Sequence, residues 1–354
     1  MEDKMKKIIY ILVLLLFVMT SCDSSSSDDK KSTNTVPFTP TTGQIDGSSI
    51  IIDHTAVDDF DKIPQEYIDA VKSMVFNIVG QSHARSYIYG LEQLMADNGN
   101  YAMVSTWSGT LGDPPQAGDP VALRVLRTWK KSESYYSDSA GEENIFTDTD
   151  GIELMKAHLT ALKEAGNQAT VFGFGWCWDM SWHNTPGGDY DSYNGIDFRW
   201  AGASEGGPDG DLAWGLDSGD QAATGNSINL NTYLAAIDGY NIHEPDTITM
   251  FTTGPTDKYF DENGYQRYVK HEMIRKYVKD NDGKILFDFA DILSYNNSGV
   301  QATESFTDRN SVLATYPVSH ADNVAEYDGG QGSGHVSREG CIRLGKAIWV
   351  MLAR

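Results

Sequence analysis

The stretch that decides the fold is residues 75–98, VFNIVGQSHARSYIYGLEQLMADN. It begins with a short apolar run at residues 75–79, which is typical of a buried strand and is ended by Gly80. After the turn, apolar residues recur at helical spacing over residues 85–98. The stretch therefore predicts a strand, a tight turn and a helix, with Ser82 and His83 in the turn.

The same alternation continues along the chain. Helical spacing recurs in residues 63–74, 152–164, 230–240, 266–280 and 337–353, and strand-like apolar runs lie at residues 101–107, 169–175, 247–253 and 285–293. Helices between apolar strands predict crossover units, and therefore an α/β fold with a parallel sheet covered on both faces. In such folds chemistry occurs beyond the carboxyl ends of the strands. Ser82, residues 176–184, residues 253–257 and the chain from Tyr295 onward are expected there.

The composition excludes several classes of protein. Lys and Arg number 27 against 50 Asp and Glu, a net charge of −23, so the chain repels phosphate backbones and is not expected to bind nucleic acid. Hydrophobic residues make up 40%, which suffices for a sizeable core and argues against global disorder. No internal run is long and apolar enough to span a bilayer.

The N-terminal residues predict export to the cell envelope. A basic segment ending at Lys7 precedes a mostly apolar run at residues 8–21, which has signal-peptide length and is too short for a transmembrane helix. The run ends in VMTSC at residues 18–22, which resembles a bacterial lipobox. We therefore expect residues 1–21 to be removed and Cys22 to carry a lipid anchor at a membrane. The alternative is a plain secretory signal whose cysteine is incidental.

Three further segments complete the organisation. Residues 22–44 are rich in Ser, Asp and Thr, a composition that predicts a disordered tether. Residues 45–354 are expected to form the folded domain. Within it, residues 184–228 form an insertion rich in Gly, Asp and aromatic residues, including Trp200 and Trp214. This insertion either contacts a sugar substrate or is a surface excursion pinned by its aromatic side chains.

Two residues far apart in the sequence indicate catalysis. Ser82 is expected at the mouth of the sheet, near the N-terminus of the following helix. Backbone N–H groups and the positive end of the helix dipole stabilise a developing oxyanion at such a position. His335 precedes the final helix, and a histidine there can accept the proton of Ser82.

The block Gly80-Gln81-Ser82 and the segment from His335 to the end of the chain resemble the SGNH (GDSL-like) hydrolase superfamily. In that family the nucleophilic serine follows the first strand in a G-D-S or G-Q-S block, and the base histidine precedes the last helix. The resemblance covers residues 70–354 and extends to bacterial lipoproteins of the superfamily. It implies a three-layer α/β/α sandwich with a mostly parallel five-stranded sheet, and a serine esterase that needs no cofactor and no metal.

The sequence departs from the family pattern beside the histidine. The aspartate that usually stands three residues earlier is replaced by Gly332. Another group must therefore orient His335. We take Asp328 as this third catalytic residue. The alternatives are Asp322, Glu326 and a backbone carbonyl.

The oxyanion donors also depart from the pattern. Gly109 and Gly112 are candidates for the family's glycine after the second strand. Trp178 stands where the family has an asparagine after the third strand, so Asn184 is the candidate substitute. Because a lost donor typically costs about 10²–10³-fold in rate, an inactive member remains an alternative.

Other residues near the strand ends are candidates for substrate binding. His83 is expected to face the substrate or to stabilise its loop. Trp176, Trp178, Trp182 and His183 either line the pocket or form a packed aromatic cluster.

Several polar groupings and the remaining cysteines have two interpretations. His54 with Asp53, Asp58 and Asp59 is a potential metal cluster, but capping or solvated side chains are the preferred interpretation. The segment DTDG at residues 148–151 lacks the ligands of a calcium loop and is interpreted as a helix cap.

Asp288 and Asp291 either face the cleft or end a strand with satisfied hydrogen bonds. Cys177 and Cys341 either form a disulfide or remain buried thiols.

The sequence thus predicts a membrane-anchored ester hydrolase that removes acyl groups, such as acetyl, from carbohydrate at the cell envelope. The anchor is compatible with the outer membrane, the periplasm or the cell surface. A non-catalytic glycan-binding lipoprotein on the same scaffold is the main alternative. A glycoside hydrolase with paired carboxylates is a third interpretation, but no spacing singles out such a pair.

Overall fold

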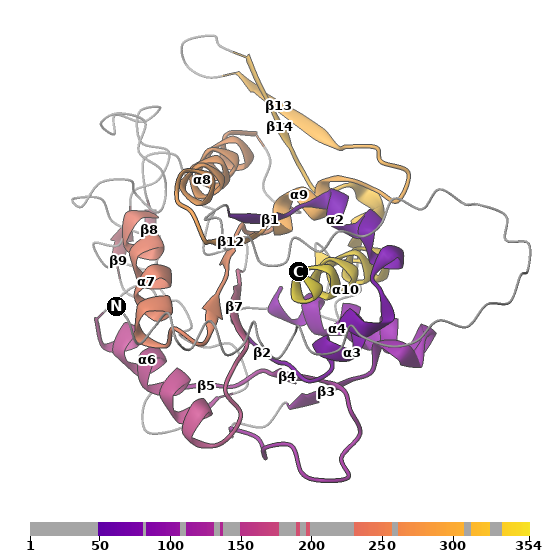
Figure 1. Ribbon diagram of the computed structural model, residues 1–354. Coiled ribbons are helices and arrows are strands. Elements are labelled where there is room, and N and C mark those ends of the chain that lie inside the picture. Colours follow the sequence, from indigo (N-terminus) through magenta and orange to yellow (C-terminus); the bar gives the residue numbers. More distant parts are fainter. Residues whose placement is uncertain are drawn as a thin grey trace, which may run out of the picture. The chain divides into compact units, whose positions relative to one another are not determined.

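A computed structural model gives the fold of the chain (Figure 1). The structure describes residues 49–80, 83–106, 111–130, 135–136, 149–176, 189–191, 196–198, 230–256, 261–307, 313–325 and 335–354. All of them belong to one compact unit, Phe38–Arg354.

The main sheet has five strands in the order β10-β7-β2-β4-β3, and every pairing in it is parallel. Its strands are β2 (Val75–Gly80), β3 (Met103–Thr106), β4 (Leu123–Leu126), β7 (Val171–Gly175) and β10 (Ile248–Thr249). A five-stranded parallel sheet, which the resemblance implies, is therefore confirmed, but it contains β4, which the sequence does not predict, and lacks the strand expected from residue 285.

A second parallel sheet adjoins the first. It has the order β1-β12-β11, with β1 (Ile50–Ile52), β12 (Ile285–Phe287) and β11 (Phe251–Thr252). Met250 alone separates β10 from β11, and its N–H donates to the Phe172 carbonyl of β7 at 3.0 Å. The strands β2, β7, β11, β12 and β1 therefore point in the same direction. The pairs β2–β7, β7–β10, β11–β12 and β1–β12 are all parallel, and β11 continues the chain from β10 after Met250.

Helices connect these strands and bury apolar clusters against them, two of which are large. The helices are α2 (His54–Asp59), α3 (Gln65–Val71), α4 (Ala84–Asp97), α6 (Thr149–Glu164), α7 (Leu230–His243), α8 (Asp261–Asp280), α9 (Phe289–Ser294) and α10 (Arg338–Ala353). One cluster joins residues of α4 and α10, and the other joins residues of α6, α7 and α8. Neighbouring residues of β12 divide between them, Phe287 in the first and Leu286 in the second. The fold class is α/β with mostly parallel sheets.

Among the described residues, four two-stranded antiparallel ribbons accompany the parallel sheets. They are β5 (Trp129–Lys130) with β6 (Tyr135–Tyr136), β8 (Asp189–Asp191) with β9 (Ile196–Phe198), β13 (Thr303–Thr307) with β14 (Leu313–Pro317), and β15 (Val324–Ala325) with β16 (His335–Val336). The ribbon of β8 and β9 lies within the insertion expected at residues 184–228.

The strand expected at residues 285–293 is wrong beyond Phe287. Asp288 accepts a hydrogen bond from the Asp291 N–H at 3.2 Å and caps α9, which begins at Phe289. A side-chain acceptor at this position satisfies an N–H that the first helical turn leaves open. The apolar run therefore continues as a helix.

The described helices include none that is both long and apolar enough to span a membrane.

Candidate functional site at the strand ends

The turn after β2 requires glycine. Gly80 has φ +126°, and a Cβ there would lie 2.2 Å from the Gly175 carbonyl oxygen at the end of β7. A Cβ on Gly175 would lie 2.6 Å from the Cα of Ala84, the first residue of α4. Only residues without a Cβ allow the two strand ends and the helix to approach so closely. This packing holds the chain on both sides of Ser82, which itself lies outside the described residues.

His83 and His335 meet at this edge of the sheet. Their rings are stacked, with centroids 4.9 Å apart and planes inclined by 23°. His83 is fully buried and His335 is 7% exposed. His335 pairs with Ala325 in the ribbon of β15 and β16, which fixes its backbone. The structure thus brings His335 against the residue that directly follows Ser82 in the sequence.

The close crossing of α4 and α10 explains this meeting (Figure 1). A Cβ on Gly90 of α4 would lie 1.8 Å from the Cys341 carbonyl oxygen, and one on Gly345 of α10 would lie 2.6 Å from the Gly90 carbonyl carbon. His83 immediately precedes α4, and His335 stands three residues before α10. The glycine contact therefore draws together the segments that carry the two histidines.

One of the expected acid partners of His335 interacts elsewhere. The Asp322 carboxylate lies 3.4 Å from His320 Nδ1 and accepts a hydrogen bond from Asn296 at 3.2 Å. Its side chain is 61% exposed, whereas His335 is buried. Glu326 and Asp328 lie outside the described residues.

Trp176 and His83, both expected to bind substrate, are buried. Their burial favours a packing role over contact with the substrate. Trp176 is 4% exposed, its indole N–H donates to the Thr252 carbonyl at 3.3 Å, and its ring meets Phe174 and Tyr233 edge to face. Trp176 is therefore packed among aromatic rings of the core, whereas the other three members of the expected cluster lie outside the described residues. The full burial of His83 likewise favours a supporting role over substrate contact.

Gly112 lies beside the ends of β3 and β4, because a Cβ there would lie 3.6 Å from Thr106 Oγ1 and 3.5 Å from Leu126 Cδ2, in the last residue of each strand. Its carbonyl accepts a hydrogen bond at 2.8 Å from Asn167, which precedes β7 and so marks the amino end of that strand. Gly112 thus lies near strand ends of both kinds, and its role as an oxyanion donor at the carboxyl edge stays a prediction.

The remaining candidates lie outside the described residues. They are the catalytic Ser82 and Asp328, the oxyanion candidates Gly109 and Asn184, the substrate candidates Trp178, Trp182, His183, Trp200 and Trp214, and the lipidation site Cys22. Cys177 also lies there, and Cys341 is fully buried in α10 with its thiol 4.0 Å from the Val336 carbonyl.

A buried ion pair supports the carboxyl end of β12. Arg275 of α8 donates to both carboxylate oxygens of Asp288, at 2.6 and 2.7 Å, and the Thr253 hydroxyl donates to the same carboxylate at 2.9 Å. Burial alone would lower the pKa of Arg275, but Asp288, with a smaller contribution from Glu272, raises it. Asp288 is thus a satisfied strand terminus. Nothing in the sequence pattern of residues 266–280 distinguishes Arg275 from the other basic residues there.

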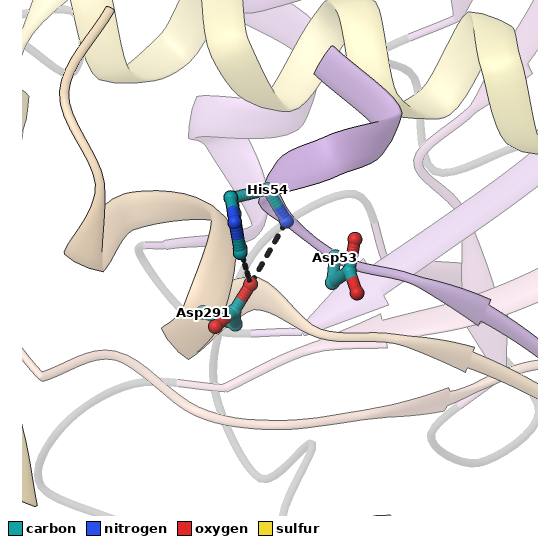
Figure 2. A group of neighbouring side chains, drawn as sticks. All are labelled: Asp53, His54 and Asp291. Atoms are coloured by element: carbon teal, nitrogen blue, oxygen red, sulfur yellow. Dashed lines mark hydrogen bonds and ion pairs between the residues drawn. The ribbon is translucent and has the colours of Figure 1, made fainter. Parts of the chain in front are cut away.

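A second polar group, Asp53, His54 and Asp291, lies at the carboxyl ends of β1 and β12 (Figure 2). One ligand atom from each residue lies within 4.8 Å of the others. Asp53 caps α2 by accepting from the Thr55 N–H at 2.9 Å. The His54 ring stacks on Tyr295, with centroids 3.6 Å apart.

This group fits a hydrogen-bonded tie better than a metal site. His54 Nδ1 lies 2.6 Å from Asp291 Oδ2, and the His54 backbone N–H donates to the same oxygen at 2.8 Å. Two atoms that each lie about 2 Å from one tetrahedral ion are separated by more than about 3 Å. Asp59, expected in this cluster, instead pairs with Lys62 at 2.8 Å and with Arg354 at 2.9 Å. The capping interpretation of Asp53 is confirmed.

Comparisons with known proteins assign no family. No protein-family model and no curated protein sequence matches this chain significantly.

Proposed function

We propose that the protein is a serine ester hydrolase in which Ser82 is the nucleophile and His335 the general base. The observation that supports this most is the stacking of buried His335 on His83, the residue next to Ser82. The turn at Gly80, at the carboxyl edge of a parallel sheet, is a second support, because chemistry in such folds occurs at that edge.

The proposed reaction proceeds in two halves. Ser82 Oγ attacks the ester carbonyl while its proton passes to His335, and the tetrahedral oxyanion is stabilised by backbone N–H groups at the start of α4. The alcohol leaves with the proton from His335, and Ser82 carries the acyl group. Water then attacks the acyl-enzyme and gives a proton to His335, which passes it to Ser82 Oγ as the acyl–oxygen bond breaks and the carboxylic acid leaves.

The finer features of the proposal follow the resemblance to the SGNH superfamily. The two apolar clusters, with β12 dividing its neighbouring residues between them, support a three-layer sandwich. The substrate class we propose is acylated carbohydrate at the cell envelope, to which the protein is tethered through lipidated Cys22. The aromatic residues of the insertion support a sugar-binding wall.

Turnover of an aryl acetate by Ser82→Ala tests the proposal. We expect loss of activity of at least about 10³-fold, because the residual rate would rest on binding and oxyanion stabilisation alone. Ser73→Ala is the matched control. Ser73 lies just before β2, is exposed, and donates its hydroxyl hydrogen to the Ala70 carbonyl. Unchanged turnover in Ser82→Ala would remove Ser82 as the nucleophile.

Two departures from the family pattern favour a second function, a glycan-binding protein without catalysis. Gly332 and Trp178 replace an acid and an oxyanion donor of the family. This function predicts that wild type does not hydrolyse acetylated xylan or aryl acetates, and that calorimetry detects the same saccharide affinity in wild type and Ser82→Ala.

A further inference from the structure

We propose that His83 is a positioning residue that fixes the imidazole plane of His335 for proton transfer. This inference rests on the proposed function, in which His335 is the base. It assigns to His83 a role that differs from substrate contact.

The ring contacts of His83 carry the inference. His83 is fully buried, and its ring lies on that of His335 at 4.9 Å with the planes inclined by only 23°. Phe289 meets His83 edge to face at 6.1 Å. His335 therefore faces a ring that is itself held by an aromatic neighbour, and rotation of its imidazole about the Cβ–Cγ bond would break the stack.

An ion pair and hydrogen bonds hold the residues that support this stack. Phe289 begins α9, and the preceding Asp288 is held by Arg275 at 2.6 and 2.7 Å and by Thr253 at 2.9 Å. The Thr253 hydroxyl also accepts from the Ala290 N–H at 2.9 Å. A continuous set of packed and hydrogen-bonded groups thus leads from α8 through α9 to the two histidines.

Fixing the ring plane matters because proton transfer is sensitive to geometry. A misplacement of about 1 Å can cost about 10²-fold in rate even when no reacting atom is removed. Stacking covers the face of the His335 ring. The ring nitrogens form hydrogen bonds in the plane of the ring, so the stack does not block them. A supporting ring can therefore raise kcat without contributing to substrate affinity.

The test compares His83→Phe with His83→Leu, using kcat and KM for an aryl acetate. Phenylalanine keeps a planar ring against His335, whereas leucine fills similar space without one. We expect His83→Leu to lower kcat by about 10–100-fold with KM within about twofold, and His83→Phe to stay within about threefold of wild type. Equal kcat values in the two variants would overturn the inference.

His158→Leu is the matched control for removing a buried histidine. His158 lies in α6, is fully buried and is hydrogen-bonded to Asn77 at 3.0 Å. We expect a lower Tm and unchanged kcat. If this variant lost as much kcat as His83→Leu, the effect would belong to general destabilisation and the inference would fail.

Two further variants keep the test decisive. If His83→Leu does not fold, Phe289→Leu removes the edge contact while leaving both histidines, and a smaller fall in kcat at unchanged KM is expected. Unchanged kcat in that variant would overturn the inference. Ser82→Ala separates the two proposals: if turnover survives it, the proposed function itself fails. Loss of turnover in Ser82→Ala with wild-type kcat in His83→Leu overturns only the role of His83.

Discussion

Arg275 and Asp288 form the buried ion pair on which the end of β12 depends. Their side chains are 11% and 4% exposed. Removing one partner leaves the other charge buried without compensation, so Arg275→Met should lower the free energy of unfolding by about 3–5 kcal/mol. Chemical denaturation of both proteins measures this difference.

Lys276 provides the control from the next position of the same helix. It pairs with Asp280 at the surface, where the two side chains are 75% and 55% exposed. Exposed pairs contribute little because solvent screens them. A loss of stability in Lys276→Met as large as that in Arg275→Met would contradict the assignment of a buried, essential pair.

Asp291 predicts a pH dependence with an unusual sign for an acid. Burial first, and the nearby Asp288 charge second, raise the pKa of Asp291 against the opposing effect of His54. The folded protein then binds this proton more tightly than the unfolded chain. The contribution of Asp291 to stability therefore falls as pH rises from about 4, its ordinary pKa, through the raised value.

Asp291→Asn tests this sign because asparagine keeps an acceptor for the His54 N–H but does not titrate. The difference in unfolding free energy, variant minus wild type, should increase with pH across that window. Denaturation at several pH values measures it. A difference that is flat or decreases with pH would contradict the raised pKa.

At the scale of elements, the crossing of α4 and α10 is the contact most sensitive to side-chain size. The missing Cβ of Gly90 would lie 1.8 Å from a backbone oxygen of α10. Gly90→Ala must push the helices apart, and we expect a loss of about 3 kcal/mol in unfolding free energy. If His335 is the base, activity should fall with it, because the same crossing brings His335 to His83.

Gly239→Ala is the matched helix-interior control. Nothing lies within 4 Å of a Cβ at Gly239 in α7. Alanine there should raise stability by roughly 0.5–1 kcal/mol through helix propensity. Thermal unfolding measures the stability of both variants. If Gly90→Ala were as stable as Gly239→Ala, the close contact of α4 and α10 at Gly90 would be refuted.

Most elements could be predicted because their apolar period is unambiguous. The strand expected at residues 75–79 is β2, and the helix expected at residues 85–98 is α4, each displaced by one residue or less at its ends. β12 is harder to bound, since the residues at 285–293 other than Asp288 and Asp291 are apolar, and only the Asp288 cap divides strand from helix. Periodicity cannot separate a short buried strand from a short buried helix.

For the whole molecule, the sequence predicts which distant segments of the chain meet, but not which residues surround them. Parallel topology places His335 and the turn after β2 at one edge, and the stack with His83 agrees with that prediction. The Arg275–Asp288 pair and the His54–Asp291 tie join residues far apart in the sequence, and no local pattern marks such partners. Ser82 and the expected acid Asp328 stay predictions.

The proposed lipidation of Cys22 is tested on the whole protein expressed in a bacterium. We expect the protein to incorporate labelled palmitate and to enter the detergent phase on phase separation, because the acyl chains supply the apolar surface that the acidic domain lacks. Cys22→Ser should lose both properties. Equal labelling of wild type and Cys22→Ser would place the lipid elsewhere.

The most direct measurement of the central claim is the site of covalent labelling by a fluorophosphonate, located by peptide mass spectrometry. We predict one adduct on Ser82 in wild type, and greatly slowed labelling in His335→Ala because the serine then loses its base. Absence of an adduct in folded wild-type protein, or an adduct on another serine, would contradict the assignment of Ser82 and His335 as nucleophile and base.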